Sequence, residues 1–359
     1  MMNNNVKTAM VGTPCQILAA TKINEYSDET GGSSIDVKIG LFCMENFSYT
    51  YLKEFLIDKK IDINNVKGFR IEENKFKVIL NNNDIFMVPL SETDSFKRKN
   101  CDICLDYTSD ISDISIGSLG SPKGWSTVII RTEKGKKILE NAEKENYFET
   151  KEISEKGKQL LERIANQKIQ KNLENINLRE EVSRPVIYRR KISDDEIEEI
   201  SSECQFENLE SDVISEGACV LCGACEYVCP IDIVKIDDRK PQKFGECKED
   251  CHACYYACPR TFLSENILGY DFEEKPLGDY LDIVSVRSSK IKGQDGGAVT
   301  SILMYLLEEG LVDNVSIVGE DENISWKPVS RLTSDVEEVK KAAGTKYSTV
   351  PIGFKALEK

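Results

Sequence analysis

The spacing of apolar positions predicts a chain that mixes strands and helices. Short apolar runs at residues 6–11 and 37–43 predict strands, and a Gly-Thr-Pro-Cys-Gln turn leads from the first of them into a helix. Residues 48–61 have the apolar spacing of an amphipathic helix. Residues 69–90 alternate between apolar and polar positions and are broken twice by polar residues, which predicts a β-meander.

The second part of the chain continues this mixture. Its strands are predicted at residues 126–132, 280–289 and 314–320, with helices over 133–175, after the Gly-rich turn at 293–297, and from Ser334 to near Gly344. Residues 186–214 are acidic and have no clear period, which predicts a solvated linker.

Composition excludes several classes of partner. The chain has 359 residues, a net charge of −15 and 30% charged residues, so neither nucleic acid nor an anionic membrane is an expected partner. No apolar run approaches the length of a transmembrane helix, and the first residues do not resemble a signal peptide. We therefore expect a cytoplasmic protein without a transmembrane segment. The only histidine, His252, lies inside a cysteine run, which excludes a catalytic histidine elsewhere.

Two cysteine runs dominate the candidate chemistry. The first has the spacing C-x2-C-x2-C-x3-C-P, which is typical of bacterial-type [4Fe–4S] sites, and the second is one residue longer. In such pairs the cysteine before proline binds the other cluster. The predicted ligands are Cys219, Cys222, Cys225 and Cys258 for one cluster, and Cys247, Cys251, Cys254 and Cys229 for the other. Zinc sites and disulfides fit this spacing less well, since zinc needs only four ligands and disulfides suit small secreted domains.

Five cysteines lie outside these runs. Cys15 and Cys43 come at the ends of predicted strands, and Cys101 and Cys104 form a C-x2-C pair. These four thiols would bind a third [4Fe–4S] cluster if they converge, but spacing alone leaves a zinc site or a redox pair open. Cys204 lies in the acidic segment and is expected to be a free thiol.

Several longer motifs resemble the coenzyme F420 hydrogenase/dehydrogenase β subunit family of methanogens and related archaea. They are VGTPCQI at 11–17, IGLFCMENF at 39–47, the stretch from Cys101 to Thr132, GQDGGAVTSIL at 293–303 and AAGTKYS at 342–348. The resemblance implies an FAD-containing oxidoreductase that takes part in the electron transfer of methanogenesis. It implies that Cys15, Cys43, Cys101 and Cys104 are cluster ligands.

The resemblance also implies what the cofactors do. A 5-deazaflavin such as F420 transfers hydride, a cluster accepts single electrons, and FAD mediates between them. The turn at 293–297 begins a helix and is a candidate phosphate site, although Gly-Gly alone is more often only a turn. The candidate FAD contacts are Gly293, Gln294, Asp295, Gly296, Gly297, Thr300, Gly344, Thr345, Lys346 and Tyr347. Expected partners are other redox subunits of hydrogenase, heterodisulfide reductase, sulfite reductase-like or membrane dehydrogenase type.

The order of the motifs departs from the family, because the GQDGGAVT half follows the GTPCQ half here. A circular permutation, an exchange of halves with a second copy of the chain, or a chain cut out of register would each explain this order. The expected fold class is α+β, a mixed α/β flavin domain in two halves with a 2[4Fe–4S] ferredoxin-like domain between them. The expected domains are residues 1–185 (C-terminal-type half), the acidic linker at 186–214, the ferredoxin-like domain at 215–264, and residues 265–359 (N-terminal-type half).

Three functions are compatible with these features. The first is an F420-dependent oxidoreductase that works through FAD and three clusters. The second is a non-catalytic, polyferredoxin-like electron conduit with degenerate flavin halves. The third is the same flavin scaffold acting on another substrate, because a fold does not fix its substrate.

Overall fold

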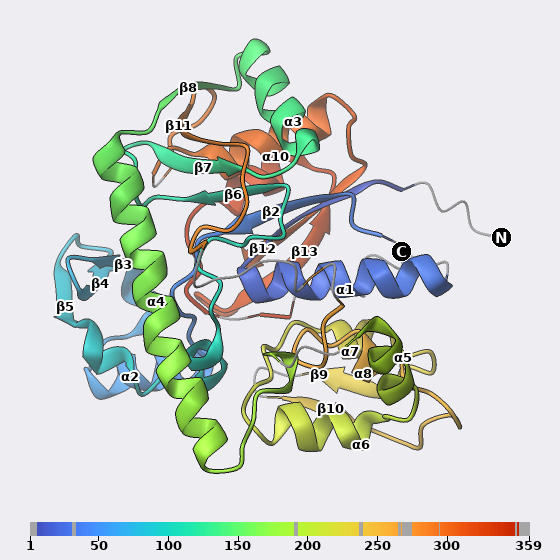
Figure 1. Ribbon diagram of the computed structural model, residues 1–359. Helices are drawn as coiled ribbons and strands as arrows, with labels where there is room; N and C mark the ends of the chain where they lie inside the picture. The colour runs from blue at the N-terminus through green and yellow to red at the C-terminus, as the bar shows by residue number, and fades with distance from the viewer. Residues whose placement is uncertain are drawn as a thin grey trace.

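The computed structural model describes residues 6–30, 34–189, 193–236, 240–264, 267, 275–293, 295–348 and 350–351. Within these ranges the largest element is an eight-stranded mixed sheet with the order β13-β12-β1-β2-β6-β7-β11-β8 (Figure 1). Its strands are β1 (Thr8–Gly12), β2 (Val37–Leu41), β6 (Ile114–Gly117), β7 (Ser126–Ile130), β8 (Phe148–Glu152), β11 (Asp282–Ser288), β12 (Asn314–Glu320) and β13 (Pro328–Thr333).

Both halves of the chain contribute to this sheet. β1 pairs in parallel with β12 on one side, where Thr8 faces Asn314, and with β2 on the other. β2 and β6 are also parallel, whereas the remaining pairs are antiparallel. The Gln16 side-chain amide donates a hydrogen bond to the carbonyl of Val350 at 3.1 Å, so residue 350 lies beside the first helix. The reversed halves thus complete one sheet within a single chain.

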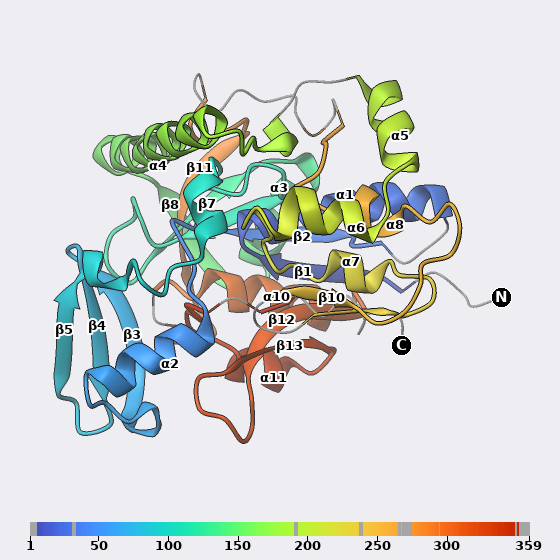
Figure 2. The ribbon, with the colours of Figure 1, turned by 90° about the horizontal axis from the view of Figure 1, so that it is seen from below.

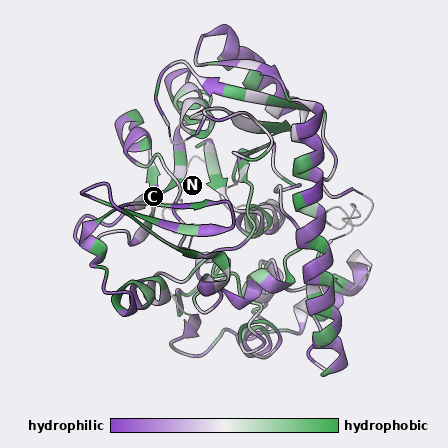
Figure 3. Ribbon diagram, turned by 90° about the vertical axis from the view of Figure 1, so that its left-hand side faces the viewer, coloured by the Kyte–Doolittle hydropathy of each residue, from purple (hydrophilic) through white to green (hydrophobic). Residues whose placement is uncertain are grey.

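Helices cover both faces of the sheet. On one face α3 (Glu133–Lys144), α10 (Ala298–Glu308) and α11 (Val336–Lys341) pack over a core that includes Ile302 and Leu306. On the other face lie α1 (Pro14–Thr30) and the long α4 (Glu155–Glu181). Figure 3 shows α4 as mostly hydrophilic along its length. In the part of the chain that the structure describes, no helix combines the length and the apolar character needed to span a bilayer.

A small sheet of three strands lies beside the main one (Figure 2). β3 (Val66–Glu72), β4 (Lys75–Leu80) and β5 (Ile85–Pro89) form the expected meander, with α2 (Tyr49–Asp58) against it. Glu73 and Asn74 both have positive φ at the first turn, a conformation that asparagine adopts more readily than most residues.

The cysteine-rich segment packs against α1, on the side away from the sheet (Figures 1 and 2). It contains the antiparallel pair β9 (Val234–Ile236) and β10 (Pro241–Lys243) and the one-turn helices α7 (Ala224–Tyr227) and α8 (Ala253–Tyr256). The segment expected as a linker is structured in its described part. It contains α5 (Asp194–Ser202), α6 (Phe206–Leu209) and a π-helical turn at 210–214, and it buries apolar side chains in the same core as the cysteines.

The structure corrects several elements. Residues 133–175 are not helical throughout, because β8 separates α3 from α4. α11 begins at Val336, and the Asp335 side chain caps it by accepting from the Glu337 amide at 2.8 Å, so Ser334 is not the cap. β6 and β13 were not predicted from the sequence pattern.

Candidate functional site

The first cysteine run lies on a tight loop that ends in α7. Gly223 has φ +89° at the helix start, a left-handed conformation that suits glycine. Burial raises the pKa of the Cys222 thiol well above its usual value, and the nearby thiols of Cys258, Cys219 and Cys15 raise it further. The amide of Ala224 donates to Cys222 and opposes this rise in pKa. Cys225 has the same neighbours, because Cys222, Cys219 and Cys258 also raise its pKa.

The second run makes a matching group. Burial raises the pKa of the Cys254 thiol to about 12, and the thiols of Cys247, Cys251, Cys258 and Cys229 add to the rise. Each run therefore lies beside the cysteine that precedes proline in the other run.

All thirteen cysteines lie in described residues, and none forms a disulfide. Within those residues, no three His, Cys, Asp or Glu side chains converge closely enough to hold a single metal ion. The four thiolates of a cubane bind four different irons, so they stand farther apart than ligands to one ion.

The other four candidate ligands meet in a second place. Cys15, Cys43, Cys101 and Cys104 all line one small, largely enclosed cavity of about 20 Å³. We call it the four-cysteine cavity. Burial raises the pKa of the Cys101 thiol to about 12, although a hydrogen bond from the Asn46 amide at 3.3 Å opposes the rise.

Separate elements deliver these four thiols. Cys15 lies in the first turn of α1, immediately beyond the carboxyl end of β1, and Cys43 follows β2. Because β1 and β2 are parallel, their ends meet at one edge of the sheet. Cys101 lies in a 3₁₀ turn, Lys99–Ile103, and Cys104 follows directly.

One face of α4 holds the backbone of these segments. The Lys168 ammonium donates to the carbonyls of Cys43 at 2.6 Å and Asp106 at 2.7 Å. One turn later, the Asn172 amide donates to the carbonyls of Cys101 at 2.8 Å and Cys104 at 2.7 Å. Residues four apart lie on one helix face, so the spacing of Lys168 and Asn172 explains how α4 fixes two loop segments at once, the one at Cys43 and the one from 101 to 106.

A larger cavity, which we call the sheet-edge cavity, adjoins the first. It has a volume of about 380 Å³ and lies where β1, β2 and β6 end beside the start of α10. Among the sequence-predicted cofactor contacts, those that line it are Gly293, Asp295, Gly297, Thr300, Gly344, Thr345, Lys346 and Tyr347.

Two predicted contacts are not among these lining residues. Gly296 is not among the lining residues. A Cβ at this position would lie 2.3 Å from both the Ser126 nitrogen and the Val286 carbonyl oxygen, so Gly296 lets the turn pack against β7 and β11. Gln294 lies outside the described residues.

The sequence pattern missed much of the cavity wall. The additional lining residues at strand ends are Gly12, Thr13, Leu41, Phe42, Ile116, Gly117 and Ser118. All of them lie at or just beyond the carboxyl ends of β1, β2 and β6, the edge where open α/β sheets bind ligands. That rule could have identified the residues at the ends of β1 and β2, since both of these strands were predicted from the sequence.

The two cavities share part of their walls. Thr13, Gln16 and Asn46 line both of them. The Thr13 hydroxyl lies 3.4 Å from the Cys15 thiol, and its backbone amide donates to the Gln16 side chain at 2.9 Å. A molecule in the sheet-edge cavity is therefore separated from the four cysteines by a single layer of side chains.

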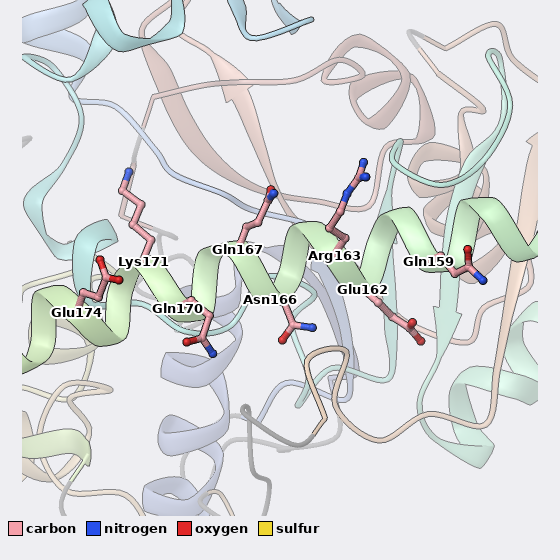
Figure 4. Close-up of a pocket in the computed structure, with 8 residues that line it drawn as sticks. All are labelled: Gln159, Glu162, Arg163, Asn166, Gln167, Gln170, Lys171 and Glu174. Atoms are coloured by element: carbon pink, nitrogen blue, oxygen red, sulfur yellow. The ribbon is translucent and has the colours of Figure 1, made fainter.

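A third hollow follows the outer surface of α4 (Figure 4). It is open, and every side chain that lines it comes from this one helix. Its polar groups do not converge on a point, so it is not a candidate site.

Two family models match the chain. The one for the C terminus of the coenzyme F420 hydrogenase/dehydrogenase beta chain matches residues 6–156, and the corresponding N-terminal model matches residues 283–357. The chain belongs to this family. The model for the C terminus matches first along the chain, so the reversed order expected from the motifs is confirmed.

Relatives of this family share about half of the chain. The coenzyme F420 hydrogenase subunit beta of Methanococcus voltae is 38% identical over 185 residues, which cover 51% of this chain and 66% of that protein. The coenzyme F420-dependent sulfite reductase of Methanocaldococcus jannaschii is 35% identical over 139 residues, 38% of this chain and 21% of that protein. A solved F420-reducing [NiFe] hydrogenase complex from Methanosarcina barkeri contains a chain 37% identical, with 48% of this chain and 60% of that chain covered at a TM-score of 0.45.

Proposed function

We propose that this chain is an iron–sulfur flavoprotein that transfers electrons between coenzyme F420 and [4Fe–4S] clusters through FAD, as a module of a larger redox complex. The observation that supports this most is the shared wall of Thr13, Gln16 and Asn46, because a cofactor bound in the sheet-edge cavity would lie beside four cysteines. When bound, FAD supplies the conversion between two-electron hydride transfer and single-electron transfer.

The sheet-edge cavity suits a large cofactor with both apolar and phosphate parts. Gly297 has φ +71° and caps α10, an 11-residue helix whose first backbone amides face the cavity region and favour an anion. Lys346 provides a half-buried cation on the same wall, and burial lowers its pKa. Asp295 also lines the cavity and would repel a phosphate, but a carboxylate there can accept hydrogen bonds from ribose hydroxyls.

The four-cysteine cavity suits a cluster better than a structural zinc. Two nitrogens of the buried Arg260 guanidinium, Nε and Nη2, have no hydrogen-bond partner in the structure. Arg260 lines this cavity. A buried donor without an acceptor is costly, and a sulfide-containing anionic group would supply acceptors.

The neighbours of each thiol suggest the order of the sites. Cys15 from the four-cysteine cavity raises the pKa of Cys219 and Cys222, after the larger effect of burial. Cys254 in turn is among the thiols that raise the pKa of Cys225. We propose that electrons pass from the sheet-edge cavity to the third cluster, then to the Cys222 cluster, and leave through the Cys254 cluster to a partner redox protein.

Cofactor content and substrate titration test this function. The protein purified anaerobically should release FAD with acid and contain about twelve irons, four for each cubane. Reduced F420, added stepwise, should bleach the flavin absorbance, whereas NADPH should not. Full iron without FAD would replace this proposal with the electron conduit, and bleaching by NADPH alone would assign the scaffold to another substrate.

A further inference from the structure

Two buried cations face the four-cysteine cavity from opposite parts of the chain. Lys168 projects from α4 and is 3% exposed, and Arg260 follows the second cysteine run and is also 3% exposed. Both line the cavity together with the four cysteines. Neither was among the candidate site residues suggested by the sequence, because neither belongs to a cysteine motif.

The cations lack the carboxylate partners that buried cations normally have. Among the described residues, neither Lys168 nor Arg260 forms an ion pair with Asp or Glu within 4.0 Å. The Lys168 ammonium donates hydrogen bonds to two backbone carbonyls. The Arg260 guanidinium lies over the Tyr188 ring, with its carbon 4.4 Å from the ring centroid. Removing an ammonium or guanidinium group from water costs about several kcal/mol unless a nearby anion compensates for the lost hydration.

The anion-forming groups that share the cavity wall with both cations are thiols, because Cys15, Cys43, Cys101 and Cys104 line the same cavity as Lys168 and Arg260. The Asp106 carboxylate also lies close enough to attract the charge of Lys168. A cubane with four thiolate ligands is anionic in both oxidation states and becomes more negative when it is reduced.

We propose that Lys168 and Arg260 are positioning residues that raise the reduction potential of the third cluster by stabilising its reduced, more negative form. This inference rests on the proposed function, since it requires a cluster in the four-cysteine cavity. In a water-poor cavity the attraction between a fixed cation and an added electron is weakly screened, so each charge makes the cluster a better acceptor. Arg260 also lies two residues after Cys258, and its backbone amide donates to that thiol at 3.4 Å.

Redox titration of the whole protein tests the role of these charges. Electron paramagnetic resonance would follow each cluster against potential, and the signal absent from Cys101→Ser identifies the third cluster. We expect Lys168→Gln, which retains amide donors for the carbonyls, to lower that midpoint potential by at least about 59 mV, a tenfold change in a one-electron equilibrium. Arg260→Gln should shift it in the same direction.

A matched control lies on the same helix. Lys171 is exposed on the outer surface of α4 (Figure 4), so Lys171→Gln removes the same charge without reaching the cavity and should leave the potential unchanged. An unchanged potential in Lys168→Gln and Arg260→Gln, with iron retained, would overturn the proposal. Should Lys168→Gln lose four irons, Arg260→Gln decides alone, and loss of the cluster in both variants assigns these residues to structure only.

The failure of the proposed function gives a different result. Wild-type protein with iron for only two clusters, or with zinc in the four-cysteine cavity, would remove the third cluster itself. In that case no third signal appears in any titration, whereas failure of the present inference leaves the signal in place at an unshifted potential.

Discussion

Replacing Asn172 with alanine tests whether α4 supports the loop that carries Cys101 and Cys104. Asn172 is 4% exposed, and its amide holds the carbonyls of Cys101 at 2.8 Å and Cys104 at 2.7 Å. The Cys101 carbonyl keeps the Cys104 amide as a donor at 3.3 Å, so only the Cys104 carbonyl loses its donor, at a cost of about 1–3 kcal/mol. Alanine regains at most about 0.7 kcal/mol of helix propensity. The net loss of unfolding free energy should therefore be about 0.3–2.3 kcal/mol.

The same helix provides a control of opposite sign. Asn166 is exposed and points into solvent on the outer surface (Figure 4), so Asn166→Ala loses no buried partner and should gain a few tenths of a kcal/mol from helix propensity. Anaerobic urea unfolding followed by circular dichroism would compare the two variants, with iron counted per chain. We expect Asn172→Ala to lose about four irons as well as stability. Equal urea midpoints, with full iron in both variants, would refute the role of α4 as the support of this loop.

Three further outcomes are expected. Cys222→Ser and Cys254→Ser should each lose about four irons while retaining flavin, because their thiols belong to separate groups; unchanged iron, or zinc in its place, contradicts this. Cys101→Ser should leave flavin bleaching by reduced F420 intact in stopped flow but slow reduction of the ferredoxin-type clusters, whereas a structural zinc predicts unfolding or lost flavin. Gly296→Ala should lower FAD content without changing iron, because its Cβ would lie 2.3 Å from the Val286 carbonyl oxygen; full flavin content would show that the turn adapts.

The sequence pattern predicted those elements that have a strong period of their own. The meander at β3 to β5 and the strand β12 were recognised because their apolar residues alternate over several positions. β8 was missed because it is an edge strand in which only Phe148 is buried, so its sequence FETKE has almost no apolar pattern. β6 is only four residues long and is defined by its neighbours in the sheet.

The residues of the candidate site were likewise predicted only in part. Cysteine spacing is local, so the two runs were visible in the sequence. Cys15 and Cys43 were candidates because they follow predicted strands, and the resemblance implied that they are ligands. The buried cations could not be predicted, because Lys168 and Arg260 reach the cavity only through tertiary packing. The acidic segment before the first cysteine run was expected to be solvated, yet Phe206 is buried in the same core as the cysteines. A few apolar side chains are enough to anchor a segment whose average composition is charged.

The contact between α1 and the cysteine-rich segment sets the position of the four-cysteine cavity relative to the two cysteine runs. Small side chains meet there, with Ala20 of α1 near Ala224 and Ala257 of the cysteine loops, so the backbones approach closely. Cys15 begins the same helix, and its charge reaches Cys219 across this contact. The relative position of the cavities thus depends on the packing of α1 and on β1 pairing with β12, neither of which requires a particular chain connection. A connection that keeps these two contacts would therefore keep the two cavities and the cysteine runs in the same relative positions.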